Sequence, residues 1–230
     1  MRKTVATLAL LLAALHAGAQ TDEEYRMEIG GGLSMVTYEG DFGGNIFTGM
    51  QPGATVMLRR IVNPYMGFRL AATYGRLKGS SDTPSTYYPD YADGKTYTFD
   101  NTLIDCSLTY EYNFWPYGTG EDYRGAKRIT PFVFGGLGAT YVTGGGNNVF
   151  TANVPLGLGV KYKIARRLNV GLEWAIHFSL SDKLDGVADP YGISSSGLFK
   201  NTDCYSAFSL SLTYSFMPKC RTCHNDMEKY

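Results

Sequence analysis

Two features are absent from this sequence, and each absence excludes a class of protein. No run of 18 apolar residues occurs after residue 20, which excludes a membrane-spanning helix because such a helix needs about 20 apolar residues. There is also no excess of basic charge. Without Arg2 and Lys3, 19 basic residues stand against 21 acidic ones, so nothing points to a nucleic-acid partner. The mature chain is either soluble or crosses a membrane as strands.

The first 20 residues, MRKTVATLALLLAALHAGAQ, have the pattern of a secretory signal peptide. Arg2 and Lys3 form a basic start, an apolar stretch of about a dozen residues follows, and Ala17 and Ala19 are the small residues before a cut. No cysteine follows the cut, so lipoprotein processing is not indicated. We expect residues 1–19 to be removed and the mature chain to be exported from a bacterial cell.

Glycine and aromatic residues are plentiful, with 28 Gly, 18 Tyr and 12 Phe, and the length fits one domain of the sandwich or barrel kind. Residues 152–180 alternate between apolar and small or polar side chains, with a break only at 165–167. Two alternating stretches joined by a tight turn predict a hairpin. Strands of globular proteins usually have about five or six residues, whereas a tilted membrane strand needs about ten. The length of this hairpin therefore favours a membrane.

Six further segments alternate with varying clarity: 27–37, 54–59, 68–75, 103–114, 129–142 and 208–216. The first and fifth are the weakest, because their glycines blur the two faces. Together with the hairpin, they give eight strands. The sequence thus predicts an all-β fold, an eight-stranded antiparallel transmembrane β-barrel of the outer-membrane type with a short periplasmic tail at its C-terminus.

The predicted links have about 12, 5, 21, 14, 9, 3 and 23 residues, so the odd-numbered links are longer on average. Outer-membrane barrels have short periplasmic turns and long outer loops, and both termini of a barrel with an even number of strands lie in the periplasm. A soluble secreted sandwich also alternates, but its strands are shorter and its polar faces carry more charge. We expect a barrel surrounded by outer-membrane lipid, with both termini in the periplasm.

The polar faces of these strands carry charged residues that point into the barrel or lie near its rims: Arg59, Arg69, Asp105, Glu111, Lys161, Lys163, Glu173 and His177. An eight-stranded barrel is just wide enough to be filled by side chains, so we expect a network of paired charges. Glu173 and His177, with Ser179 or Ser181 nearby, have the residue types of an esterase relay. Four residues along a strand span about 13 Å, however, which is too far for a hydrogen bond. We expect no catalytic activity and no cofactor.

The predicted outer loop at 181–190 carries Asp182, Asp185 and Asp189. Their spacing does not repeat the alternating oxygens of a calcium loop. We interpret these carboxylates as solvating the loop, with weak cation binding as the alternative, and expect no dedicated metal site.

Near the C-terminus, Cys220-x-x-Cys223-His224 has the spacing of a c-type haem attachment site. The chain around it is too short to cover a haem, and the three residues lack a fourth ligand for zinc. Exported cysteines tend to be oxidised. Three arrangements stay open: a local disulfide, a disulfide to a partner protein and a thioether-linked haem. Cys106 and Cys204 lie on or near predicted strands and are interpreted as packing residues.

Several stretches carry a family resemblance: YEGDF at 38–42, YGRL at 74–77, PFVFGGLGATY at 131–141, VPLGLGVKYKIARRLNVGLEW at 154–174, SDKLDGV at 181–187 and NTDCYSAFSLSLTYSF at 201–216. In them the chain resembles the small outer-membrane barrel family of Bacteroidota. Its length, signal peptide and cysteine-bearing tail are similar to those of the PorG-type component of the type IX secretion system. The resemblance implies a structural subunit that contacts a periplasmic ring of a PorK-type lipoprotein and a PorN-type protein.

The predicted organisation is a signal peptide at 1–19, an outer-membrane β-barrel at 20–217 and a periplasmic tail at 218–230. Two functions are compatible with it. The first is a non-enzymatic anchoring subunit of a secretion machine, docked through the tail by Cys220 or Cys223. The second is a free-standing barrel for adhesion or envelope integrity that acts through its outer loops.

Overall fold

The computed structural model describes residues 25–40, 49–82, 96–118, 126–144, 147–181, 183–184 and 203–218. The regular elements in this part of the chain are strands of 12 to 17 residues. At about 3.3 Å per residue, such strands cross an apolar layer about 25 Å thick even when tilted by about 40°. The strands are β1 (Tyr25–Glu39), β2 (Gln51–Asn63), β3 (Met66–Ser80), β4 (Thr98–Asn113), β5 (Ile129–Gly144), β6 (Asn147–Lys163), β7 (Leu168–Ser179) and β8 (Cys204–Pro218).

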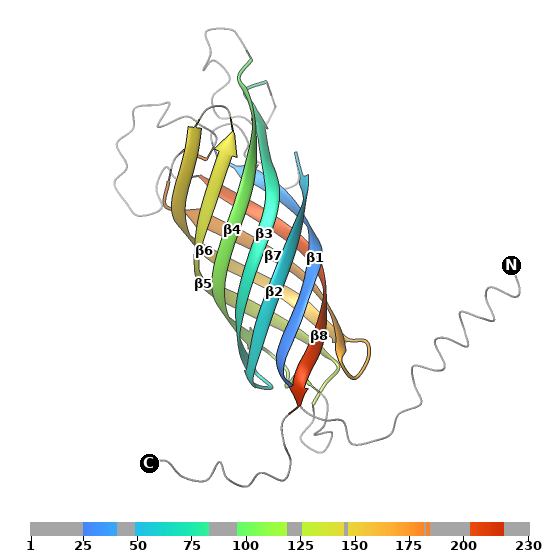
Figure 1. Ribbon diagram of the computed structural model, residues 1–230. Coiled ribbons are helices and arrows are strands. Elements are labelled where there is room, and N and C mark those ends of the chain that lie inside the picture. Colours follow the sequence, from blue (N-terminus) through green and yellow to red (C-terminus); the bar gives the residue numbers. More distant parts are fainter. Residues whose placement is uncertain are drawn as a thin grey trace, which may run out of the picture.

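Each strand pairs antiparallel with its neighbour in the sequence, and β1 also pairs with β8, so the sheet closes into a barrel (Figure 1). Closure leaves no sheet edge unpaired. The predicted eight-stranded antiparallel barrel is confirmed. Among the described residues, no helix has the length and apolar character that a membrane crossing would need.

The barrel has two rims, which we name by what they carry. At the terminal rim β1 begins and β8 ends, with Tyr25 opposite Pro218, and the links 64–65, 114–128 and 164–167 lie there too. At the loop rim β1, β3, β5 and β7 end and β2, β4, β6 and β8 begin.

One predicted link was wrong. The chain between β5 and β6 was expected to form a loop of about nine residues, but the two strands stay paired up to Gly144 and Asn147, which leaves only residues 145 and 146 between them. The run of glycines and asparagines there lacks alternation, yet the ladder continues because backbone hydrogen bonds do not depend on side-chain pattern.

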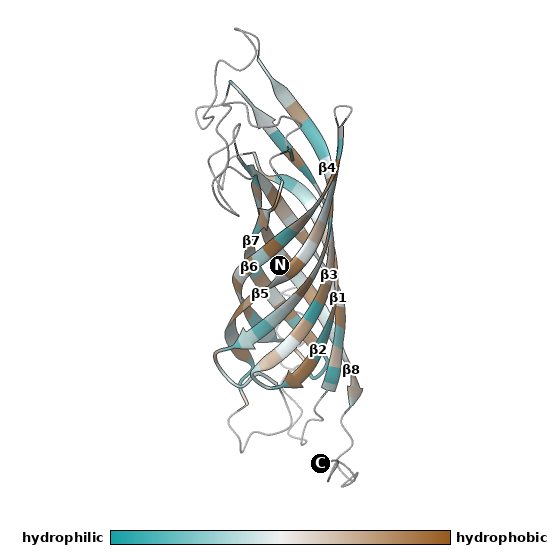
Figure 2. Cartoon of the chain, turned by 90° about the vertical axis from the view of Figure 1, so that its left-hand side faces the viewer, coloured by the Kyte–Doolittle hydropathy of each residue, from teal (hydrophilic) through white to brown (hydrophobic). Residues whose placement is uncertain are grey.

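Hydrophobic and hydrophilic residues alternate along the strands (Figure 2), and the two faces of the wall differ sharply in chemistry. Outward-facing side chains are mostly apolar and strongly exposed, as at Leu33 (74%), Leu137 (72%) and Phe150 (75%), whereas the inward face is dominated by buried polar residues. This is the reverse of a soluble protein, and it excludes the soluble sandwich considered above. The outer surface fits contact with lipid acyl chains.

Glycines in the weakly patterned first segment let β1 approach β8 closely. A Cβ atom on Gly30 would collide with the carbonyl oxygen of Leu212, and one on Gly32 with that of Leu210. We call this contact the β1–β8 seam. The glycines that obscured the alternation of β1 are therefore a requirement of barrel closure.

Candidate functional site

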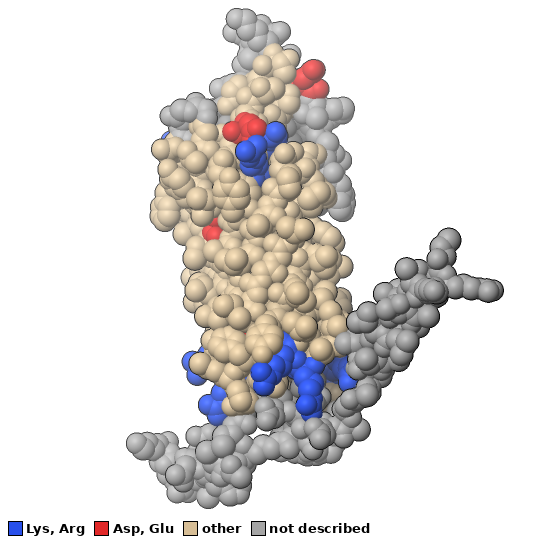
Figure 3. Space-filling view, turned by 45° about the vertical axis from the view of Figure 1, so that its right-hand side comes forward, with Lys and Arg blue, Asp and Glu red and all other residues tan. Residues whose placement is uncertain are grey.

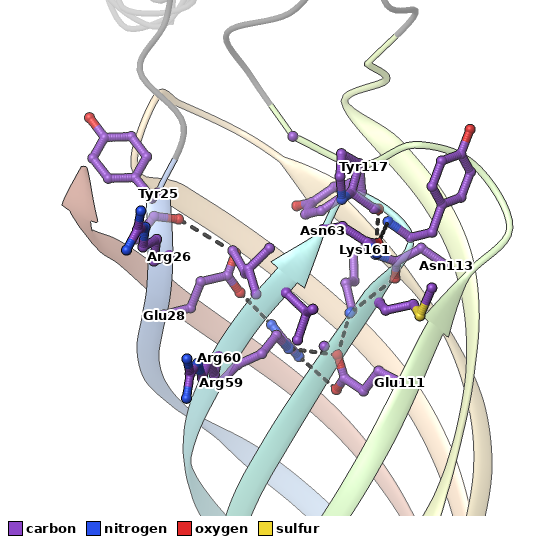
Figure 4. Close-up of a pocket in the computed structure, with 18 of the residues that line it drawn as sticks. Tyr25, Arg26, Glu28, Arg59, Arg60, Asn63, Glu111, Asn113, Tyr117 and Lys161 are labelled. Atoms are coloured by element: carbon purple, nitrogen blue, oxygen red, sulfur yellow. Dashed lines mark hydrogen bonds and ion pairs between the residues drawn. The ribbon is translucent and has the colours of Figure 1, made fainter. Parts of the chain in front are cut away.

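The half of the barrel interior next to the terminal rim holds a charge network centred on Glu111 of β4. Its Oε2 atom lies 2.7 Å from Arg59 Nε and 2.5 Å from Lys161 Nζ, and its Oε1 atom lies 3.4 Å from Arg69 Nε. Arg59 also donates through Nη1 to Glu28 Oε2 at 2.5 Å. Figure 4 shows Arg59 between Glu28 and Glu111. One carboxylate thus joins cations from three different strands.

A further ion pair joins Arg69 to Glu173 across the barrel. Three carboxylates, those of Glu28, Glu111 and Glu173, therefore contact three cations. Two of these cations lie over the faces of aromatic rings from β5. The Arg69 guanidinium is 4.3 Å from the centroid of the Phe134 ring, and Lys161 Nζ is 4.1 Å from the centroid of the Phe132 ring. These buried charges have both ionic and cation–π partners.

The strand register explains why the network forms. Arg59 on β2 is directly opposite Glu28 on β1 and Arg69 on β3. Two arginines side by side on one face repel each other, so the carboxylates of β1, β4 and β7 are needed to hold both. Glu28 was not among the predicted interior charges. It precedes Gly30 and Gly32 on the inward face of β1 and is the one acidic residue on that face. That isolated carboxylate is the signal that could have revealed it.

The middle of the interior contains a second polar cluster, built around Asp105. Its Oδ2 atom accepts hydrogen bonds from Tyr205 Oη (2.9 Å), Thr140 Oγ1 (3.1 Å) and Asn153 Nδ2 (2.5 Å). The Tyr205 hydroxyl is also 3.0 Å from Nδ1 of His177, whose ring stacks on the tyrosine ring at 4.5 Å. His177 thus belongs with Asp105 and Tyr205.

This arrangement does not assemble a hydrolytic relay. Glu173 is paired with Arg69, while His177 lies in the Asp105 cluster. The Ser179 hydroxyl bonds to Thr151 Oγ1 and to the carbonyl of Ser181. Within the described part of the chain, no group of three or more His, Cys, Asp or Glu side chains is placed to hold a metal ion. Each of these side chains is already engaged by other interior groups, as in a packed interior.

A cavity of about 930 Å³ lies inside the terminal rim (Figure 4). Its deeper lining includes Glu28, Arg59 and Lys161. Tyr117, from the link between β4 and β5, also lines it and donates its hydroxyl to Asn169 Oδ1 at 2.9 Å. Burial, reinforced by the charge of Glu28, raises the pKa of Tyr117 far above its usual range, so its hydroxyl stays a neutral donor.

Lys163, the remaining predicted interior cation, is buried at the same end of the barrel. Its Nζ atom lies 5.7 Å from the centroid of the Tyr117 ring. The structure therefore brings Arg59, Arg69, Glu111, Lys161 and Glu173 into one network and leaves Asp105 and His177 in the other, with Lys163 at the cavity.

The other end of the interior is filled by apolar side chains. Leu184, from the link between β7 and β8, is fully buried there in a cluster whose other members are Val36, Tyr38, Leu77, Phe99, Leu103, Val142, Tyr205 and Ala207. The backbone of Leu184 is held on both sides: its N–H donates to Asp203 Oδ2 (2.8 Å), and its carbonyl accepts from Asn101 Nδ2 (2.8 Å). We call Leu184 and this cluster the loop-rim plug. The alternation of the strands gave no signal of it.

The two cysteines that the structure describes, Cys106 and Cys204, do not form a disulfide. Cys106 is exposed on the outward face of β4, and Cys204 is partly buried at the start of β8. Cys220 and Cys223 lie outside the described residues, as do Asp182, Asp185 and Asp189. The predictions made for these five residues stay predictions.

Comparisons with known proteins give the fold likeness and the family of this chain. A search of curated proteins found no match. Among solved structures, neisserial surface protein A (NspA) is 13% identical and aligns over 83% of this chain and 97% of its own, with a TM-score of 0.51. OprG from Pseudomonas aeruginosa is 11% identical over 86% of this chain and 99% of its own, with a TM-score of 0.49. At such identity the likeness to NspA shows the fold alone, that of a small outer-membrane β-barrel. Residues 2–225 match a family model described as a domain of unknown function, DUF6089, and the chain belongs to that family.

Proposed function

We propose that this chain is a non-enzymatic outer-membrane anchor for the periplasmic part of a type IX protein secretion machine. In this proposal the terminal rim and the tail at 218–230 lie in the periplasm. The partners are a PorK-type lipoprotein and a PorN-type ring protein. The resemblance noted from the sequence suggests this machine, and the geometry of the interior suggests the role within it.

The observation that carries the proposal is the difference between the two mouths of the barrel. The loop-rim plug fills one mouth, whereas the cavity of about 930 Å³ lies at the other. Between them the Glu111 network and the Asp105 cluster occupy the interior with paired groups. A barrel filled in this way supports attachment more than conduction. The cavity then lies at the rim where β8 ends and the tail begins.

The decisive experiment is a truncation after Pro218, which keeps all of β8. We expect the truncated barrel to fold, to lose co-purification with the periplasmic ring proteins and to stop secretion of a type IX cargo. The matched control shortens the loop within 83–95 at the opposite rim and should leave both readouts intact. Retention of ring proteins by the truncated barrel contradicts the proposal.

The tail cysteines give a finer test. If one of them bonds to a partner, non-reducing electrophoresis of membranes shows a heavier species that disappears on reduction. Cys220→Ser or Cys223→Ser should remove it, whereas Cys204→Ser, at a thiol in β8 that forms no disulfide in the structure, should not. If no heavier species forms, docking is not covalent, and the truncation experiment alone decides the proposal.

A free-standing barrel for adhesion or envelope integrity is the second candidate. Two links at the loop rim, 81–97 and 180–203, are much longer than 64–65 and 164–167 at the terminal rim, as expected if the outer loops carry the function. In this case the truncation after Pro218 leaves function intact, while shortening the loops abolishes it. The same pair of variants therefore separates the two candidates.

A further inference from the structure

The terminal rim carries exposed cations around the barrel. Figure 3 shows basic side chains gathered along this edge on the face in view. The exposed Lys and Arg residues that the structure describes at this end are Arg26, which also lines the cavity, Arg60, Lys127, Arg128, Arg166 and Arg167. They come from β1, from β2, from the residues before β5 and from the link between β6 and β7. The acidic residues described at this end, Glu28 and Glu111, are buried inside the barrel. The described outer edge of this rim is therefore cationic.

The loop rim has no such excess in its described part. Lys78 is paired there with Asp100 at 3.0 Å, and Asp82 and Lys183 are exposed as well. Exposed charges of both signs are thus mixed in the described part of the loop rim. At the terminal rim the described cations are exposed and the described carboxylates are buried. General solubility does not require this asymmetry, because it would be served by either sign at either rim.

The cations lie beside outward-facing aromatic rings. Lys127 Nζ is 4.6 Å from the centroid of the Trp115 ring. Arg167 donates through Nε to the Tyr25 hydroxyl (3.0 Å) and through Nη1 to the Tyr214 hydroxyl (2.9 Å). Tyrosine and tryptophan with exposed rings and polar tips are typical of the headgroup level of a membrane. The cations that touch them are at the same depth.

We propose that the terminal rim is a girdle that binds the phosphate groups of anionic phospholipids in the adjacent leaflet. Guanidinium groups bind phosphate through paired hydrogen bonds, and Arg167 uses two of its five N–H donors for the tyrosines. A lipid leaflet surrounds the barrel, as the cations do, whereas a protein partner would contact one side. This goes beyond the anchoring role and does not depend on it.

The test uses the full mature chain, purified in mixed micelles of phosphatidylglycerol and phosphatidylcholine, with native mass spectrometry counting the lipids retained. We expect the protein to retain phosphatidylglycerol several-fold more than phosphatidylcholine. Added salt should weaken this preference, whereas soluble glycerol phosphate should not. The double variant Arg60→Gln with Arg128→Gln should bring the preference close to equal retention. The matched control, Arg76→Gln with Lys78→Gln, removes two exposed cations near the loop rim and should change nothing.

Folding of each variant is checked by its heat-dependent shift in electrophoresis, and Arg166→Gln, in a link, replaces the double variant if that fails to fold. Equal retention of the two lipids by the unaltered protein overturns the proposal. So does an equal loss of preference in the control. A third outcome would also overturn the proposal: no preference between the two lipids, together with displacement of the lipid by an acidic soluble protein. The girdle would then be assigned to a protein partner.

Discussion

Arg69 and Leu77 are eight residues apart on β3, and both point into the barrel, yet their surroundings have nothing in common. Arg69 belongs to the network in which three cations contact three carboxylates, while Leu77 lies in the apolar loop-rim plug. In the region of Arg69 the free energy of unfolding depends on which groups carry charge, because a buried charge without an opposite partner is destabilising. In the loop-rim plug it depends on filled volume. The two halves of one interior should therefore respond to different kinds of substitution.

The largest effect is expected from Glu111→Gln, which keeps the volume and removes the charge. Three cations lose their shared carboxylate, so the free energy of unfolding should fall by about 3–5 kcal/mol. Urea unfolding in lipid vesicles, followed by tryptophan fluorescence, measures it. Adding Lys161→Met should recover part of the loss. A change below about 1 kcal/mol would show that the carboxylate is not what balances these cations.

Leu184→Ala removes volume from the plug and should lower the free energy of unfolding by about 2–3 kcal/mol. The informative partner is Leu184→Met, which nearly keeps the volume and should cost less than about 1.5 kcal/mol. A substitution that preserves volume is thus tolerated in this half and damaging at Glu111. The comparison fails if Leu184→Met is as destabilising as Leu184→Ala in the same urea titration.

Tyr205→Phe tests the layer between the two halves. Its hydroxyl bonds to Asp105 and contacts His177, so the substitution leaves buried polar groups with one partner fewer. Asp105 keeps its bonds from Thr140 and Asn153, and the ring still packs, so we expect a loss of about 1–2 kcal/mol. An unchanged midpoint of unfolding would mean that the hydroxyl of Tyr205 contributes nothing to stability. The middle layer would then behave like the apolar half, where packing of the ring is what stabilises.

The smallest effect is expected at the exposed pair of Lys78 and Asp100. Both side chains are more than two-fifths exposed, so water screens the attraction between them. Lys78→Gln should change the free energy of unfolding by less than about 0.5 kcal/mol, and a double-mutant cycle with Asp100→Asn should give a coupling of similar size. A coupling comparable with that at Glu111 would remove the distinction between buried and surface charge.

Much of the fold could be predicted because alternation is local. A period of two identifies a strand and its inward face from a few consecutive residues, which is why the interior positions of Arg69, Glu111 and Glu173 followed from the sequence. The pairing of Arg69 with Glu173 did not follow, since it joins strands far apart in the chain and depends on the stagger of the closed barrel. Leu184 could not be predicted either, because a link residue enters the core through tertiary contacts that no periodicity records.

The β1–β8 seam also sets an order in time. Thr213 and Glu28, which meet across it, are 185 positions apart, so the first strand of the barrel has no partner on one side until the last has been made. During that interval both β1 and the growing end of the sheet are open edges, which can recruit other chains. Shortening the chain into β8 would therefore yield an aggregation-prone open sheet rather than a smaller barrel, and Pro218 marks how far the C-terminus can be trimmed.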